Sequence, residues 1–145
     1  MRTLSIAILT ALIAGSVSAQ KTPGVLRVKA EGLRSDRGQV ICELYSSAEG
    51  FPAKPEKAVA KVSAAIHQGQ ASCEFAGLAA GTYAVALIHD ENGNGRLDTN
   101  FLGIPREGVG ATNNARSRFG PPKFDEAAFH YTGGVLELVV KMGYL

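Results

Sequence analysis

Apolar and polar residues alternate along most of the chain after residue 24, with the two-residue period of β-strands. In VLRVKAE (25–31), Leu26, Val28 and Ala30 alternate with charged residues, which predicts a strand with one buried and one solvated face. Similar alternation recurs in GQVICELYS (38–46), AKVSAAIH (60–67), QASCEFAG (70–77), EAAFHYT (126–132) and VLELVVKM (135–142). The pattern therefore predicts strands almost throughout and no long helix, apart from one possible turn after Pro55.

The stretch from Thr82 to His89 is apolar on both faces, which is typical of a central strand. Thr132-Gly133-Gly134 predicts a hairpin that joins the last two strands. With these, the sequence predicts seven strands in an all-β, antiparallel β-sandwich of the immunoglobulin or transthyretin-like kind, in one domain over residues 20–145.

Residues 90–123 break the strand pattern. Glycines and prolines punctuate this segment, and a structureless loop of this length in a compact domain is usually functional or disordered. It contains apolar residues that can pack against the domain, among them Phe101, Ile104 and Phe119. We therefore expect one long, ordered loop at an end of the sandwich.

The first nineteen residues resemble a secretory signal peptide. Arg2 supplies a short positive region, residues 4–17 are apolar or small, and Val17 and Ala19 place small side chains where a signal peptidase reads. The alternative is an N-terminal membrane anchor, for which the apolar run is short. We expect cleavage after Ala19 and export to the periplasm or the medium, with no transmembrane segment in the mature chain.

Two cysteines, Cys42 and Cys73, fall on the faces of their strands predicted to point inward. In an exported protein, two thiols this far apart favour a structural disulfide over a redox pair, which usually has Cys-x-x-Cys spacing.

The overall charge is close to balance, with 15 Lys and Arg against 13 Asp and Glu. This balance argues against nucleic acid as the main partner.

The segment DENGNGRLD (90–98) has the spacing of a calcium loop of the EF-hand type. Asp90, Asn92 and Asn94 occupy positions 1, 3 and 5, Arg96 offers a backbone carbonyl at position 7, and Asp98 is at position 9. Oxygens on alternate residues of a curled loop converge on one point, and hard oxygen ligands suit Ca²⁺. The alternative is a polar hairpin turn, since Asn-Gly favours type I′ turns.

Position 12 of the calcium pattern is Phe101, where a bidentate carboxylate is expected. The completing ligand must then come from elsewhere, with Asn100, Glu107, Asp125 and Glu126 as candidates. With two carboxylates in the core pattern, we expect weak affinity, on the order of 10⁻⁴–10⁻³ M.

Another candidate site is a pocket for a small anion, lined by His89, Arg106, Arg116 and Arg118. The simpler interpretation gives the arginines local salt bridges and His89 a single hydrogen bond at a strand end. No arrangement typical of nucleophilic or metal-dependent catalysis stands out, so we expect a protein that is not an enzyme.

Two segments, residues 75–110 and NNARSRFGPPKFDEAAF (113–129), resemble a family of small exported bacterial proteins catalogued as domain of unknown function 2141. That family implies no activity. Residues 78–85 are also similar to transthyretin-like and collagen-binding B-type modules, some of which carry a comparable calcium loop. That resemblance implies calcium at Asp90, Asn92, Asn94, the Arg96 carbonyl and Asp98.

The function expected from the sequence is a non-enzymatic, exported module that binds Ca²⁺ at 90–98 and presents a surface to a protein or glycan. One alternative is a binder or hydrolase of a small anion that uses residues 89–118. The other is a purely structural envelope protein with no ligand.

Overall fold

The structure, a computed structural model, describes residues 15–16 and 24–145. The expected signal peptide lies outside the described residues except for Gly15 and Ser16, so its cleavage stays a prediction. Within the described part of the chain, no helix is both long and apolar enough to cross a membrane.

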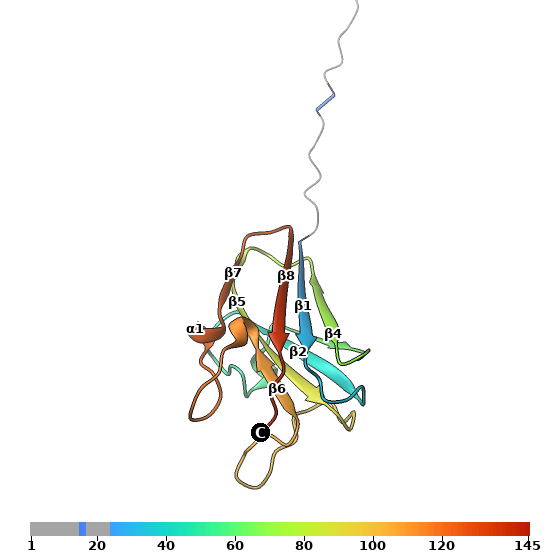
Figure 1. The fold of residues 1–145 in the computed structure, drawn as a ribbon. Helices are drawn as coiled ribbons and strands as arrows, with labels where there is room; N and C mark the ends of the chain where they lie inside the picture. The colour runs from blue at the N-terminus through green and yellow to red at the C-terminus, as the bar shows by residue number, and fades with distance from the viewer. Residues whose placement is uncertain (1–14, 17–23) are drawn as a thin grey trace, which may run out of the picture.

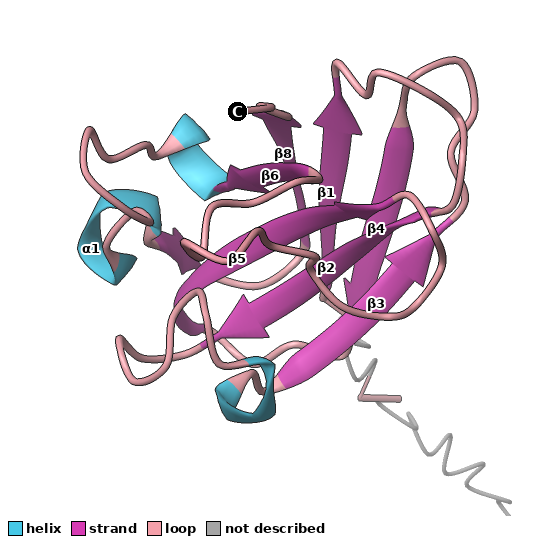
Figure 2. Ribbon diagram, turned by 90° about the horizontal axis from the view of Figure 1, so that it is seen from below, coloured by secondary structure: helices cyan, strands magenta, loops and turns pink. Residues whose placement is uncertain are grey.

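Eight strands in residues 24–145 form two sheets (Figures 1 and 2). Their bounds are β1 Val25–Glu31, β2 Gln39–Tyr45, β3 Ala60–Ala64, β4 Ala71–Ala76, β5 Gly81–Asp90, β6 Gly108–Ala111, β7 Phe129–Tyr131 and β8 Val135–Lys141. One sheet has the order β4-β1-β8 and the other β3-β2-β5-β6, with β7 paired to the start of β5. The short helices are η1 Pro55–Lys57, η2 Thr112–Asn114 and α1 Phe124–Ala127. The predictions of a mostly β protein, of a central strand at 82–89 and of a turn after Pro55 are confirmed.

The predicted count of seven strands is wrong, because β6 lies inside the segment 90–123, where the sequence predicts only loop. Two of its four residues are glycines, so no alternation marks it. A Cβ on Gly110 would lie 2.8 Å from a methyl group of Val140, and one on Gly108 would meet the Tyr144 ring. Glycine in this strand therefore permits the close approach of the C-terminal segment.

The predicted hairpin at 132–134 is also wrong. β7 pairs with β5, whereas β8 pairs with β1, so the connection carries the chain from one sheet to the other. Gly133 and Gly134 both have positive φ, and the Gly134 carbonyl accepts hydrogen bonds from the Tyr131 hydroxyl and the Val25 amide. Because β8 runs parallel to β1, the fold is not wholly antiparallel. The first residues of the predicted strand 126–132 belong instead to α1.

The main core lies between the two sheets and takes side chains from both. Its fully buried members include Leu26 and Val28 of β1, Leu44 of β2 and Val85 of β5. Cys42 of β2 and Cys73 of β4 form the expected disulfide, with 6.4 Å between their Cα atoms, and so join the two sheets.

The sequence pattern does not predict the buried carboxyl group of Glu43. It lies on the face of β2 that points away from the main core. Glu43 is 2 % exposed and accepts a hydrogen bond of 3.1 Å from the Tyr45 hydroxyl. Burial raises the pKa of Glu43, while the hydrogen bond from Tyr45 and the charge of Lys61, 3.9 Å away, oppose the rise.

We expect the double substitution Cys42→Ala, Cys73→Ala to lower the free energy of unfolding by about 3–4 kcal/mol on the chain-entropy model. The bond spans 31 residues and restricts the unfolded chain. Urea unfolding of the variant and of the oxidised wild type measures the difference. Equal midpoints and slopes would contradict a stabilising bridge.

We expect Glu43→Gln to be more stable than the wild type at neutral pH. A raised folded pKa means that the folded state holds its proton more tightly, so the stability from neutral Glu43 is present at low pH. It is lost as the pH rises through the folded pKa. The substituted glutamine side chain stays neutral and keeps a partner for Tyr45. The difference in unfolding free energy should grow as the pH rises above about 4, near the ordinary pKa of a glutamate, and a constant difference would exclude Glu43 as its source.

Candidate functional site at the end of the central strand

The central strand β5 ends on two polar side chains, His89 and Asp90, both with no exposed surface. The register places Asp90 beside Gln39 of β2, and His89 between Val40 of β2 and Gly108 of β6. Neighbours on both sides shield this strand end from water. Buried polar groups without partners are costly, so the surrounding segments have to supply hydrogen bonds.

The Asp90 carboxylate organises the segment that follows it. One oxygen accepts the Asn94 amide at 3.1 Å, and the other accepts the Gly95 amide at 2.9 Å and the Gln39 side chain at 2.9 Å. Burial alone would raise the pKa of Asp90, but these hydrogen bonds together with that from Gly93 lower it. The chain therefore curls back over the carboxylate, and Gly93 and Gly95 adopt the positive φ that the curl requires.

The predicted calcium residues come together in this curl. The side-chain amides of Asn92 and Asn94 both donate to the Asp98 carboxylate, the second at 2.9 Å. The Asn92 and Asn94 side-chain oxygens accept the backbone amides of Asn94 and Arg96. Thus Asp90, Asn92, Asn94 and Asp98 form one connected set, with Arg96 between the last two.

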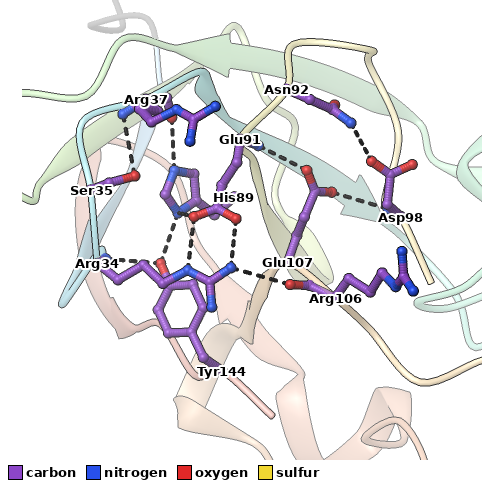
Figure 3. A network of polar contacts seen from close by, with 10 residues as sticks. All are labelled: Arg34, Ser35, Arg37, His89, Glu91, Asn92, Asp98, Arg106, Glu107 and Tyr144. Carbon is purple, nitrogen blue, oxygen red and sulfur yellow. Dashed lines mark hydrogen bonds and ion pairs between the residues drawn. The ribbon is translucent and has the colours of Figure 1, made fainter. Parts of the chain in front are cut away.

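Of the four candidates for a completing ligand, Glu107 lies against the curl. Glu107 is 5 % exposed, and its carboxylate accepts the Glu91 amide at 2.9 Å and the Asp98 amide at 3.0 Å, so it joins the two ends of the loop (Figure 3). Asn100 instead caps a turn of its own through the amides of Leu102 and Ile104.

Asp125 and Glu126 belong to α1, which lies to the left in Figure 1, away from the yellow end of β5. Glu126 accepts the Lys123 amide at 2.8 Å, and Asp125 is one of the residues that line a separate hollow. Both side chains therefore lie apart from the curl. Within the described residues, no group of three or more His, Cys, Asp and Glu side chains is arranged to hold a metal ion.

His89 is held by two hydrogen bonds, one more than expected. Its Nε2 lies 2.8 Å from the Arg37 carbonyl, which can only accept, and its Nδ1 lies 2.8 Å from the Tyr144 hydroxyl. The Arg37 carbonyl therefore makes Nε2 the donor of its hydrogen bond, and both ring nitrogens have a partner. Tyr144 also accepts the Arg34 amide at 3.1 Å, so the C-terminal segment is fixed at this point.

A bidentate ion pair covers His89 (Figure 3). The Arg34 guanidinium donates to both oxygens of Glu91, at 2.8 and 2.6 Å, and lies 4.5 Å from the centre of the Tyr144 ring. The hydrogen bond from Arg34 lowers the pKa of Glu91 against the opposing effect of burial. Arg34, Arg37 and Tyr144 carry no local pattern, and only their positions in the fold reveal this network.

An open hollow of about 380 Å³ adjoins the curl. It is lined by Arg37, Glu91, Asn92, Asp98, Thr99, Arg106 and Glu107. Arg106 is the only predicted anion-binding residue among them. His89 is buried, and Arg116 packs on Gly143 and reaches the Lys141 carbonyl at 3.5 Å. Arg118 does not line the hollow either. The expected set of one histidine and three arginines is therefore not assembled.

A family model described as "Uncharacterized protein conserved in bacteria (DUF2141)" matches residues 28–138, which is most of the chain and contains the candidate site except Tyr144. Neither the curated proteins nor the solved structures contain a match. The shorter resemblance to transthyretin-like modules is therefore not confirmed.

We expect Glu107→Ala to lower the free energy of unfolding by about 1–3 kcal/mol, because two amides lose a charged acceptor. Amide hydrogen exchange of Glu91 and Asp98 should accelerate more than exchange in β1. Glu107→Gln keeps an acceptor oxygen and should give a smaller change. Unaltered exchange at both amides in the alanine variant would show that Glu107 does not join the loop ends.

Proposed function

Because the chain belongs to this bacterial family, whose description assigns no activity, we propose a function from its own residues: an exported β-sandwich module that binds Ca²⁺ in the loop 90–98. On this proposal it is not an enzyme, and the bound loop presents a contact surface. The observation that supports it is the convergence of Asp90, Asn92, Asn94 and Asp98 in one curl.

The hydrogen bonds of Asp98 indicate where a cation fits. The carboxylate of Asp98 accepts hydrogen bonds from two side-chain amides, those of Asn92 and Asn94. A cation bound between these side chains would replace the two N–H groups as the partner of the Asp98 carboxylate. Half a turn of each amide group would then present an oxygen in place of the nitrogen. Asp90, Asn92, Asn94, Asp98 and the Arg96 carbonyl supply oxygen donors, the chemistry that Ca²⁺ prefers.

Glu107 acts in this proposal as a support. Both of its oxygens accept backbone amides of the loop, so it positions Glu91 and Asp98. Water then fills the positions that the protein leaves open. A site with two carboxylates in direct contact should bind weakly, on the order of 10⁻⁴–10⁻³ M, which suits an exported protein.

A second candidate function is binding of a small anion. It is favoured by Arg37 and Arg106, which line the open hollow and form no ion pair among the described residues. The hollow also contains the carboxylates of Asp98 and Glu107, which repel an anion. The calcium proposal is therefore preferred, and a purely structural loop is the third possibility.

We expect millimolar Ca²⁺ to raise the melting temperature of the protein by a few degrees. At ten times its dissociation constant, a ligand specific to the folded state adds about 1.4 kcal/mol. Asp98→Asn should abolish the shift, whereas the matched change Asp125→Asn, outside the curl, should preserve it. A melting temperature unaltered at 10 millimolar Ca²⁺, roughly ten times the weakest dissociation constant expected, would favour the purely structural alternative.

A further inference from the structure

The turn that follows the curl carries exposed apolar side chains. Phe101 is 95 % exposed, Leu102 67 % and Ile104 43 %. In Figure 1 the loop between β5 and β6 projects beyond the sheets, at the end of the molecule away from the starts of β1 and β8. We name residues 100–104 the apolar tip. Adjacent exposed apolar side chains on a protruding loop are typical of a contact surface.

The apolar tip is a fixed turn. The Asn100 amide donates a hydrogen bond of 2.9 Å to the Ile104 carbonyl, and the Asn100 side chain accepts the amides of Leu102 and Ile104. Below it, the Arg106 amide donates to the Asp98 carbonyl at 2.9 Å. These bonds use none of the oxygens proposed to bind Ca²⁺, so the tip holds Phe101 and Leu102 outward whether or not the curl binds the cation.

A second loop, residues 115–123, lies beside α1 at the left of Figure 1 and points downward, toward the end where the β5–β6 loop and the C-terminus lie. Its Phe119 is 89 % exposed, and the C-terminal Leu145 is 87 % exposed. Most of the large apolar side chains exposed among the described residues therefore belong to these three segments.

The same two loops carry an excess of positive charge. Residues 96–123 contain five basic residues and two acidic residues, one of which is the buried Glu107. The rest of the chain holds slightly more acidic than basic residues. The basic members are Arg96, Arg106, Arg116, Arg118 and Lys123. This end of the molecule thus combines apolar side chains with cations.

We propose that this end docks on the surface of an anionic lipid bilayer. Phe101 and Leu102 enter the boundary between headgroups and acyl chains, and the arginines of both loops meet the lipid phosphates. Arginine suits this place, since its stem lies along apolar surface while its guanidinium binds phosphate. The convex tip favours a bilayer over a protein partner or glycan, because a bilayer admits a protruding side chain without a matching pocket.

The test uses residues 20–145, which contain both sheets and the whole described core. The protein is sedimented with vesicles of equimolar phosphatidylcholine and phosphatidylglycerol, in EDTA, so that the result does not depend on the calcium site. We expect the wild type to bind these vesicles, and to bind phosphatidylcholine alone at least tenfold more weakly. Phe101→Ser with Leu102→Ser should reduce binding tenfold or more. The matched pair Val135→Ser with Val139→Ser, on β8, should leave it unchanged.

The chain has no tryptophan, so one introduced tryptophan reports its own surroundings. Emission from Phe101→Trp should shift to the blue on the anionic vesicles, whereas emission from Val135→Trp, at the far end of β8, should not. Absence of wild-type binding would overturn the proposal, as would equal loss in both serine pairs or an unshifted Phe101→Trp spectrum. Tip-dependent self-association without vesicle binding would assign the tip to a second copy of the chain instead.

Discussion

The burial of His89 and Asp90 at the end of the central strand constrains everything built around them. β2 and β6 flank this strand end, so neither side chain reaches water. Their partners come from segments far apart in the sequence: the Arg37 carbonyl, the Gln39 side chain, the loop amides and the Tyr144 hydroxyl. The polar end of this domain is therefore part of its folding, because leaving any of these groups unpaired is costly.

This constraint gives the loop its shape before any ligand is considered. Hydrogen bonds from Gln39 and the loop amides hold the pKa of Asp90 low against burial. A lowered folded pKa contributes stability that is present above the unfolded value and is lost as the pH falls through the folded one. The curl is thus stable at neutral pH, where Asp90 is ionised. On the calcium proposal, the backbone of the curl is already ordered by protein hydrogen bonds, which partly offsets a modest ligand charge.

The parts of the structure that follow from local pattern were predictable. Alternation located six of the eight strands, and the inward positions of Cys42 and Cys73 agreed with their disulfide. The spacing of residues 90–98 identified the curl and four side chains that meet in it.

The features that the sequence did not predict depend on contacts between residues far apart in the chain. β6 is a strand because it pairs with β5, and its glycines admit the C-terminal segment. β7 and β8 separate because each pairs with a different strand. Tyr144 reaches His89 across 55 residues of chain, and no local pattern records such a pairing.

Phe101 connects the curl with the surface beyond it. In the calcium pattern its position belongs to a carboxylate, which would have to turn inward to close the cage. Here the Asn100 turn directs the chain outward, and Phe101 is the most exposed large apolar side chain described. One residue cannot both close the cage and occupy the tip. Glu107, which follows the turn, joins the loop ends instead by accepting the amides of Glu91 and Asp98. The departure that weakens the expected calcium site is therefore the same one that creates the apolar tip, and the curl serves as its rigid base.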